Sequence, residues 1–124
     1  MPERNSMQRV LIAEDEALIA MLLGDLLQEL GFESRTCASV SEALDALDGS
    51  DFPFAILDVN LGTALSYPVA DSLIARGIPF AFATGYSGRG IDSAYASNVI
   101  LRKPFDKEQL SKVIERLKGG PLGA

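Results

Sequence analysis

The chain has 124 residues, of which 48% are hydrophobic, and it carries a net charge of −6 with no histidine and one cysteine. This length fits one domain with a full core, and this composition excludes both a disordered chain and a disulfide scaffold. The negative net charge argues against nucleic acid or an anionic membrane surface as a partner. The lack of histidine excludes a catalytic triad with histidine, a histidine metal site and a phosphohistidine on this chain.

The first third of the sequence predicts two strands and two helices. Gln8–Ala13 has the apolar run of a buried strand, and the leucine-rich spacing of Leu18–Leu30 predicts a helix with one wide apolar stripe that stops at Gly31. Phe32–Cys37 alternates weakly and predicts a strand at a sheet edge. Ser41 is the predicted N-cap of a short helix that closes at Gly49.

The middle of the chain centres on the apolar run Phe54–Asn60, which contains Asp58. Aliphatic residues on both faces predict a fully buried strand of a parallel sheet, with Asp58 at its carboxyl end. A polar loop is expected from Leu61 to Ser66. Pro68 then marks the start of a helix that stops at Gly77.

The last third predicts two more strands and a long amphipathic helix. Ile78–Ala83 and Asn98–Leu101 are the strands, and Tyr86–Ser97 between them predicts only a short or poorly formed helix because it is rich in Ser and Gly. Asp106 and Gln109 form a predicted capping box. The buried stripe of the final helix is expected to be Leu110, Val113, Ile114 and Leu117.

This alternation predicts an α/β fold, a doubly wound and flavodoxin-like (βα)5 unit with a parallel five-stranded sheet. The domain is expected over 8–118, with flexible termini at 1–7 and 119–124. Right-handed crossovers bring the carboxyl ends of the strands to one edge of the sheet. The residues that follow these strands are Glu14, Asp15, Asp58, Thr84 and Lys103.

Three carboxylates, a hydroxyl and an ammonium at one edge favour a specific chemistry. Clustered carboxylates are typical Mg²⁺ ligands, and a carboxylate beside Mg²⁺ can attack phosphorus to form an aspartyl phosphate. Lys103 and Thr84 would then contact oxygens of the transferred phosphoryl group. Taken alone, Asp58 could instead be a loop-starting aspartate that turns the chain.

The chain resembles the bacterial response-regulator receiver domain over nearly its whole length. The features that carry this resemblance are the acidic pair Glu14-Asp15, Asp58 after an apolar strand, Thr84, and Lys103-Pro104-Phe105. The resemblance implies that Asp58 is the phosphoacceptor and that Asp15 and Asp58 bind Mg²⁺ directly. It also implies that Glu14 acts mainly through water and that the Asn60 carbonyl supplies a further ligand.

The run Ile78–Tyr86 (IPFAFATGY) resembles a narrower group of receivers, named FATGUY after its Phe-Ala-Thr-Gly motif. This resemblance implies a histidine kinase of the HWE or HisKA2 type as the partner. Ile100 occupies the place of the usual switch aromatic, so Tyr86 is either its substitute or a surface turn residue. Tyr95 and Arg89 are expected in a solvated loop, with a partner surface as the alternative.

Other functions are compatible with the topology. A haloacid-dehalogenase-type phosphatase uses a similar aspartate, but it needs a second acid at the position of Asn60, which cannot transfer a proton. A flavodoxin-like FMN site needs a phosphate-cradling loop where this chain has Glu14-Asp15-Glu16. A receiver-like interaction module that is not phosphorylated is the third alternative.

The expected function is that of a cytoplasmic, monomeric, single-domain response regulator rather than an enzyme, catalysing at most its own phosphorylation and dephosphorylation. A histidine kinase would donate the phosphoryl group to Asp58 from its own histidine. Because no output domain is expected, the signal would pass by contact with a downstream protein, or the domain would serve as a phosphate sink or a feedback element.

Overall fold

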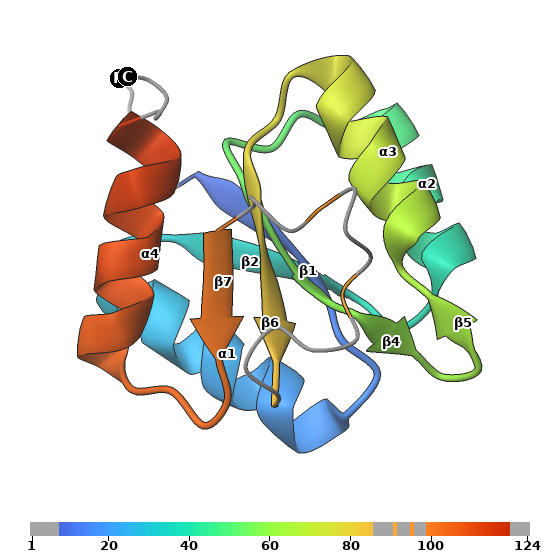
Figure 1. Ribbon diagram of the computed structural model, residues 1–124. Coiled ribbons are helices and arrows are strands. Elements are labelled where there is room, and N and C mark those ends of the chain that lie inside the picture. Colours follow the sequence, from blue (N-terminus) through green and yellow to red (C-terminus); the bar gives the residue numbers. More distant parts are fainter. Residues whose placement is uncertain (1–7, 86–90, 92–94, 96–98, 120–124) are drawn as a thin grey trace.

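The computed structural model describes residues 8–85, 91, 95 and 99–119 (Figure 1). Its main sheet has five parallel strands in the order β2-β1-β3-β6-β7. These strands are β1 (Arg9–Ala13), β2 (Glu33–Cys37), β3 (Ala55–Asp58), β6 (Phe80–Thr84) and β7 (Val99–Arg102). The predicted doubly wound parallel sheet is therefore confirmed, and β2 lies at its edge as expected.

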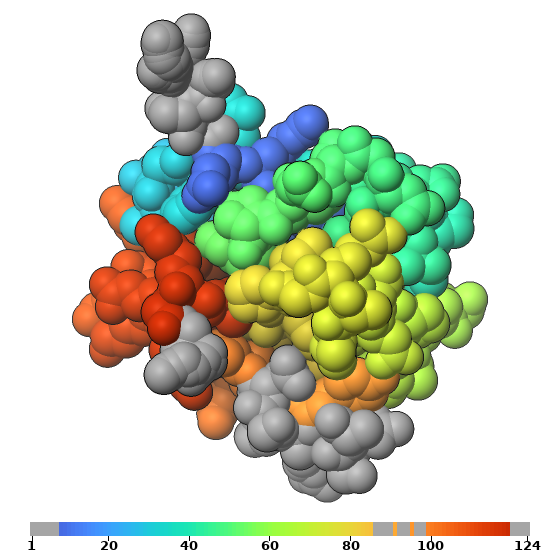
Figure 2. All heavy atoms as spheres, turned by 90° about the horizontal axis from the view of Figure 1, so that it is seen from above, coloured from blue at the N-terminus to red at the C-terminus, as the bar shows by residue number. Residues whose placement is uncertain are grey.

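Four helices cover the sheet in the described part of the chain: α1 (Ala17–Glu29), α2 (Val40–Gly49), α3 (Tyr67–Arg76) and α4 (Lys107–Gly119). Helices α2 and α3 pack on one face, and α1 and α4 pack on the other (Figure 1). Seen from the end of the molecule opposite to the carboxyl ends of the strands, α4 in red and α2 in teal-green lie on opposite sides (Figure 2). None of these described helices is both long and apolar enough to cross a membrane.

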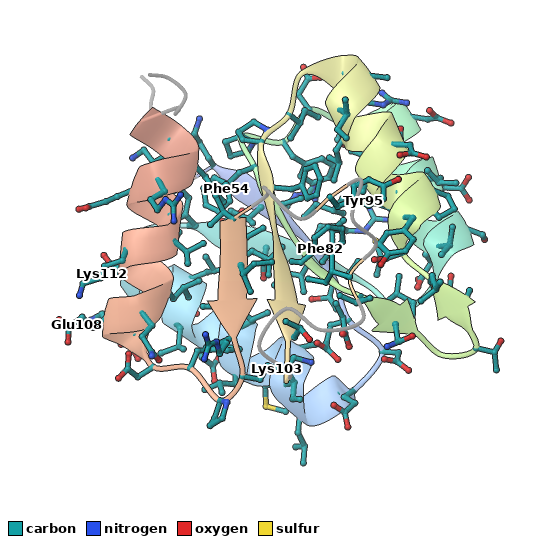
Figure 3. All side chains as sticks on the ribbon, in the orientation of Figure 1. Phe54, Phe82, Tyr95, Lys103, Glu108 and Lys112 are labelled. Carbon is teal, nitrogen blue, oxygen red and sulfur yellow. The ribbon has the colours of Figure 1, made fainter. Side chains whose placement is uncertain are left out.

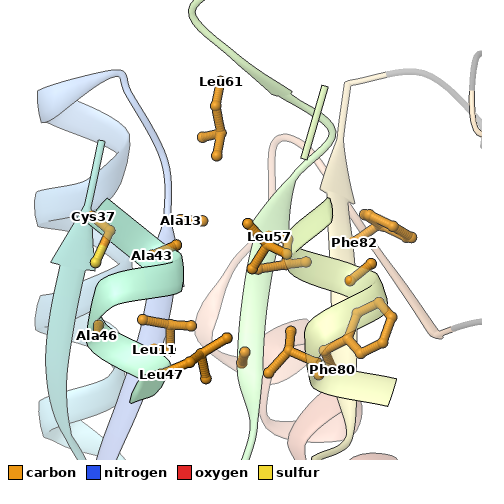
Figure 4. Close-up of a cluster of buried hydrophobic side chains, with 14 of the residues drawn as sticks. Leu11, Ala13, Cys37, Ala43, Ala46, Leu47, Leu57, Leu61, Phe80 and Phe82 are labelled. Carbon is orange, nitrogen blue, oxygen red and sulfur yellow. The ribbon is translucent and has the colours of Figure 1, made fainter. Parts of the chain in front are cut away.

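Two hydrophobic cores result from the period-two alternation of side chains along buried strands. Leu11 and Leu57 face α2 and α3 in one cluster (Figure 4), whereas Ile12 and Ile56 face α1 and α4 in the other. Strands β1 and β3 are thus apolar on both faces, and this explains why their sequences read as continuous apolar runs.

Most predicted helix ends are confirmed. Gly31 and Gly77 have positive φ angles of 95° and 73°, the left-handed conformation that terminates helices. Asp106 and Gln109 exchange hydrogen bonds in the predicted capping box, each side chain accepting from the other's backbone N–H. The cap predicted at Ser41 is wrong, because α2 begins at Val40 and the Ser39 hydroxyl accepts from the Glu42 N–H.

The wide apolar stripe predicted for the first helix is also wrong in part. Leu18 and Leu22, which belong to that predicted stripe, are exposed, with relative exposures of 78% and 45%. The side chains that α1 buries are Ala20, Leu23 and Leu27. The helix lies over β2 at the sheet edge, so only its inner side meets the sheet, and Leu18 and Leu22 face outward.

Two further differences concern the loops. The polar loop predicted after β3 contains a short antiparallel hairpin of β4 (Asn60–Leu61) and β5 (Ala64–Leu65). Most of Tyr86–Ser97, including Tyr86 and Arg89, lies outside the described residues, and so does the expected short helix. Tyr95, which is described, is buried rather than solvated.

Candidate functional site

The carboxyl ends of β1 and β3 bring three acidic side chains together. Glu14 and Asp15 follow β1, and Asp58 is the last residue of β3. One carboxylate oxygen of each lies within 4.8 Å of the others, close enough to share a metal ion. Their exposure differs: Glu14 is buried, Asp58 is partly buried and Asp15 is exposed. The predicted acidic cluster is confirmed as a geometric feature.

Lys103, directly after β7, supplies the positive charge of the cluster. Its ammonium Nζ lies 3.2 Å from Glu14 Oε1 and 3.3 Å from Asp58 Oδ2. The Lys103 backbone N–H donates to the Thr84 carbonyl over 2.8 Å, which ties the ends of β7 and β6 together. Figure 3 shows Lys103 at the lower ends of these strands, beyond Phe82.

Burial raises the pKa of the Glu14 carboxyl above its ordinary value, and the nearby Asp58 carboxylate raises it further. The Glu16 N–H, which donates to Glu14 Oε2 over 3.2 Å, and the Lys103 ammonium oppose that rise. Burial lowers the pKa of Lys103, but the attraction of Asp58 and Glu14 outweighs it, so the net shift is upward. Lys103 therefore stays protonated at neutral pH.

The remaining predicted site residues are placed by β4 and β6. Thr84 ends β6 and is almost fully buried. Asn60, two residues after Asp58, is exposed at the start of β4, and its carbonyl stays a predicted ligand. Asp15 is held from the same hairpin, because the Gly62 N–H donates to Asp15 Oδ2 over 2.9 Å.

This arrangement fits a divalent cation. With all groups ionised, the three carboxylates outweigh the Lys103 ammonium by two negative charges, which a dication would balance. Oxygen ligands of this type suit Mg²⁺, which binds through a few carboxylates and keeps several waters. The partly exposed Asp58 carboxylate would also be accessible to a reactant from solvent.

Two features of this region were missed in the sequence. The Gly62 contact is made by a backbone amide, which has no signature in the side-chain pattern. Tyr95 joins an aromatic group: its ring stacks on Tyr67 at 4.6 Å and meets Phe82 edge-on at 5.8 Å. Its hydroxyl donates to Asp71 Oδ1 on α3 over 2.5 Å.

Comparisons with known proteins agree with this geometry. The sequence model of the response regulator receiver domain matches residues 10–115. The solution structure of SdrG from Sphingomonas melonis Fr1 is similar, with 42% identity, 90% of this chain and 96% of that chain covered, and a TM-score of 0.80. A search of curated proteins found no match.

Two further solved structures are also similar. TrrA from Thermotoga maritima, in complex with Mg²⁺-BeF, has 28% identity and a TM-score of 0.79, with 90% of this chain and 99% of that chain covered. The receiver domain of the Erythrobacter litoralis response regulator PhyR has 25% identity and a TM-score of 0.78, with 90% and 89% covered.

Proposed function

The chain belongs to the response regulator receiver domain family, and on that premise we propose that it is a phosphoacceptor that takes a phosphoryl group from a histidine kinase onto Asp58. Receiver domains are signalling domains, so the proposed chemistry is the protein's own phosphorylation and dephosphorylation. The proposed receiver domain is 8–118.

The observation that carries the proposal is the position of Asp58. Asp58 ends a buried strand, its side chain is 15% exposed, and the Lys103 ammonium lies 3.3 Å from its carboxylate. In the proposed step an Asp58 oxygen forms a bond to phosphorus as the P–N bond of the kinase phosphohistidine breaks, and the imidazole leaves. Lys103 would neutralise charge on the transferred group, and the Thr84 hydroxyl would donate to another of its oxygens.

Mg²⁺ is the proposed cofactor, held by Asp15 and Asp58 directly, by Glu14 mainly through water, and by the Asn60 carbonyl. When bound, it would supply positive charge next to the transferring phosphoryl group. The spacing of the three carboxylates supports this assignment. The Mg²⁺-BeF complex of the similar TrrA supports it too.

The receiver subgroup and the type of partner kinase are proposed from the sequence motif around β6. The run Ile78–Tyr86 supports membership of the FATGUY group and, with it, a kinase of the HWE or HisKA2 type. We place the protein in the cytoplasm as a monomer. Its output would be contact with a downstream protein, or it would act as a phosphate sink or feedback element on its kinase.

Radiolabelling with an acyl phosphate tests the acceptor. We expect Mg²⁺-dependent labelling of the wild type, abolished in Asp58→Asn and retained in the matched control Asp51→Asn, which alters an exposed aspartate before β3. Labelling that persists in Asp58→Asn would refute the assignment. Wild-type protein that takes up neither label nor a beryllofluoride mimic would instead support an interaction module that is not phosphorylated.

A further inference from the structure

The β4–β5 hairpin contacts the acidic cluster through a single backbone group. The Gly62 N–H donates to Asp15 Oδ2 over 2.9 Å, and the two residues are 47 positions apart. Asp15 is exposed, and within the described part of the chain the Gly62 amide is the only hydrogen-bond donor to its carboxylate. Without this contact, an exposed side chain on a loop would be free to rotate.

The hairpin is firmly held at both ends. Leu61 is 4% exposed and belongs to the core cluster under α2 and α3, where Figure 4 shows it at the end nearest Ala13 and Leu57. At the other end, the Ser66 N–H donates to the Val59 carbonyl over 2.8 Å. The Gly62 amide is therefore presented from an anchored turn.

The turn depends on the backbone conformation of Gly62. Its φ angle is +64°, which non-glycine residues adopt only at a cost and which β-branched residues strongly disfavour. A Cβ atom added at this position would meet no atom within 4 Å. A substitution at Gly62 thus acts through the backbone angle rather than through a steric clash.

We propose that the β4–β5 hairpin is a positioning element for the metal site: the Gly62 amide holds the Asp15 carboxylate in the orientation that binds Mg²⁺. This inference takes from the proposed function only one assumption, namely that Mg²⁺ binds at the acidic cluster. A carboxylate oxygen has two lone pairs, so Asp15 can accept from Gly62 and still bind a cation. Groups that orient metal ligands in this way typically change metal affinity by about 10- to 100-fold when lost.

The test compares Gly62→Val with a matched control, Gly77→Val. Gly77 has a similar φ angle of +73° and equally open surroundings, but it ends α3 away from the acidic cluster. Both variants should lose similar stability, and Mg²⁺ alone, without any phosphoryl donor, is titrated into each by NMR. We expect Gly62→Val to bind Mg²⁺ with a Kd about tenfold higher than that of Gly77→Val. A difference smaller than threefold overturns the proposal.

Hydrogen exchange of the Gly62 amide in EDTA decides the matter if either variant does not fold. Asp15→Ala removes the acceptor, so this amide should exchange about tenfold faster than in the wild type, whereas Asp15→Asn keeps an oxygen and should change it less. Unchanged exchange in Asp15→Ala overturns the proposal. If wild-type protein binds no Mg²⁺, the proposed metal site fails as well, while equal affinities of the two valine variants refute the positioning role alone.

Discussion

Replacing Lys103 with methionine should destabilise the metal-free protein more at pH 7 than at pH 5. Methionine keeps a long apolar side chain and removes only the ammonium group. In the wild type that ammonium lies 3.2 Å from Glu14, whose side chain is 1% exposed, and 3.3 Å from Asp58, which retains contact with solvent. The main penalty therefore falls on Glu14, which would be left as a buried carboxylate without its cation.

Protonation of Glu14 limits this penalty. The ordinary pKa of a glutamate is 4.5. For each pH unit above this value, protonating the Glu14 carboxylate costs about 1.4 kcal/mol. The ceiling is therefore about 3.5 kcal/mol at pH 7 and below about 1 kcal/mol at pH 5. Because burial and Asp58 already raise the pKa of Glu14 in the wild type, part of this cost is present before the mutation. We expect a loss of about 2 kcal/mol at pH 7.

The direction of the pH dependence follows from the same shift. A group with a raised folded-state pKa favours folding most below its unfolded pKa, and this contribution is lost as the pH rises through the folded value. Loss of Lys103 raises the pKa of Glu14 further and extends that window toward neutral pH. The raised pKa of Lys103 itself means that its own contribution disappears only at strongly alkaline pH.

Urea unfolding in EDTA at pH 5, 6 and 7 measures the effect. The control is Lys107→Met, which breaks an exposed pair with Glu29 at 3.3 Å and should cost less than about 0.5 kcal/mol at every pH. A Lys103→Met penalty that is the same at pH 5 and pH 7 would contradict the reasoning, because it would show that an ionised Glu14 is not the source of the loss.

Two further substitutions test the cluster and the aromatic group. Asp15→Asn should raise the free energy of unfolding in EDTA by roughly 0.5–1 kcal/mol, because it removes one of three carboxylates that repel one another. An unchanged or lower melting temperature would mean that this repulsion does not destabilise the metal-free protein. Tyr95→Phe should lower the free energy of unfolding in urea by about 1–2 kcal/mol, because it removes the hydroxyl that donates to Asp71 while keeping the ring stacked on Tyr67. A loss below about 0.3 kcal/mol would show that this hydrogen bond does not stabilise the fold.

The sequence alone determined those parts of the protein that depend on near neighbours in the chain. The capping box of Asp106 and Gln109 and the helix stops at Gly31 and Gly77 were all predicted, because each is a local matter of hydrogen bonding or backbone angle. The acidic cluster was also predicted, since parallel strands joined by right-handed crossovers must end at one edge of the sheet.

Only the tertiary structure decided contacts whose partners carry no matching pattern. The leucine spacing of α1 gave the helix but not its buried face, because that face depends on how much of the helix lies over the sheet. The Gly62 amide reaches Asp15 across 47 positions, and the Tyr95 hydroxyl reaches Asp71 across 24. A backbone amide and a single hydroxyl can pair with almost any acceptor, so their partners are chosen by the packing that brings distant segments together.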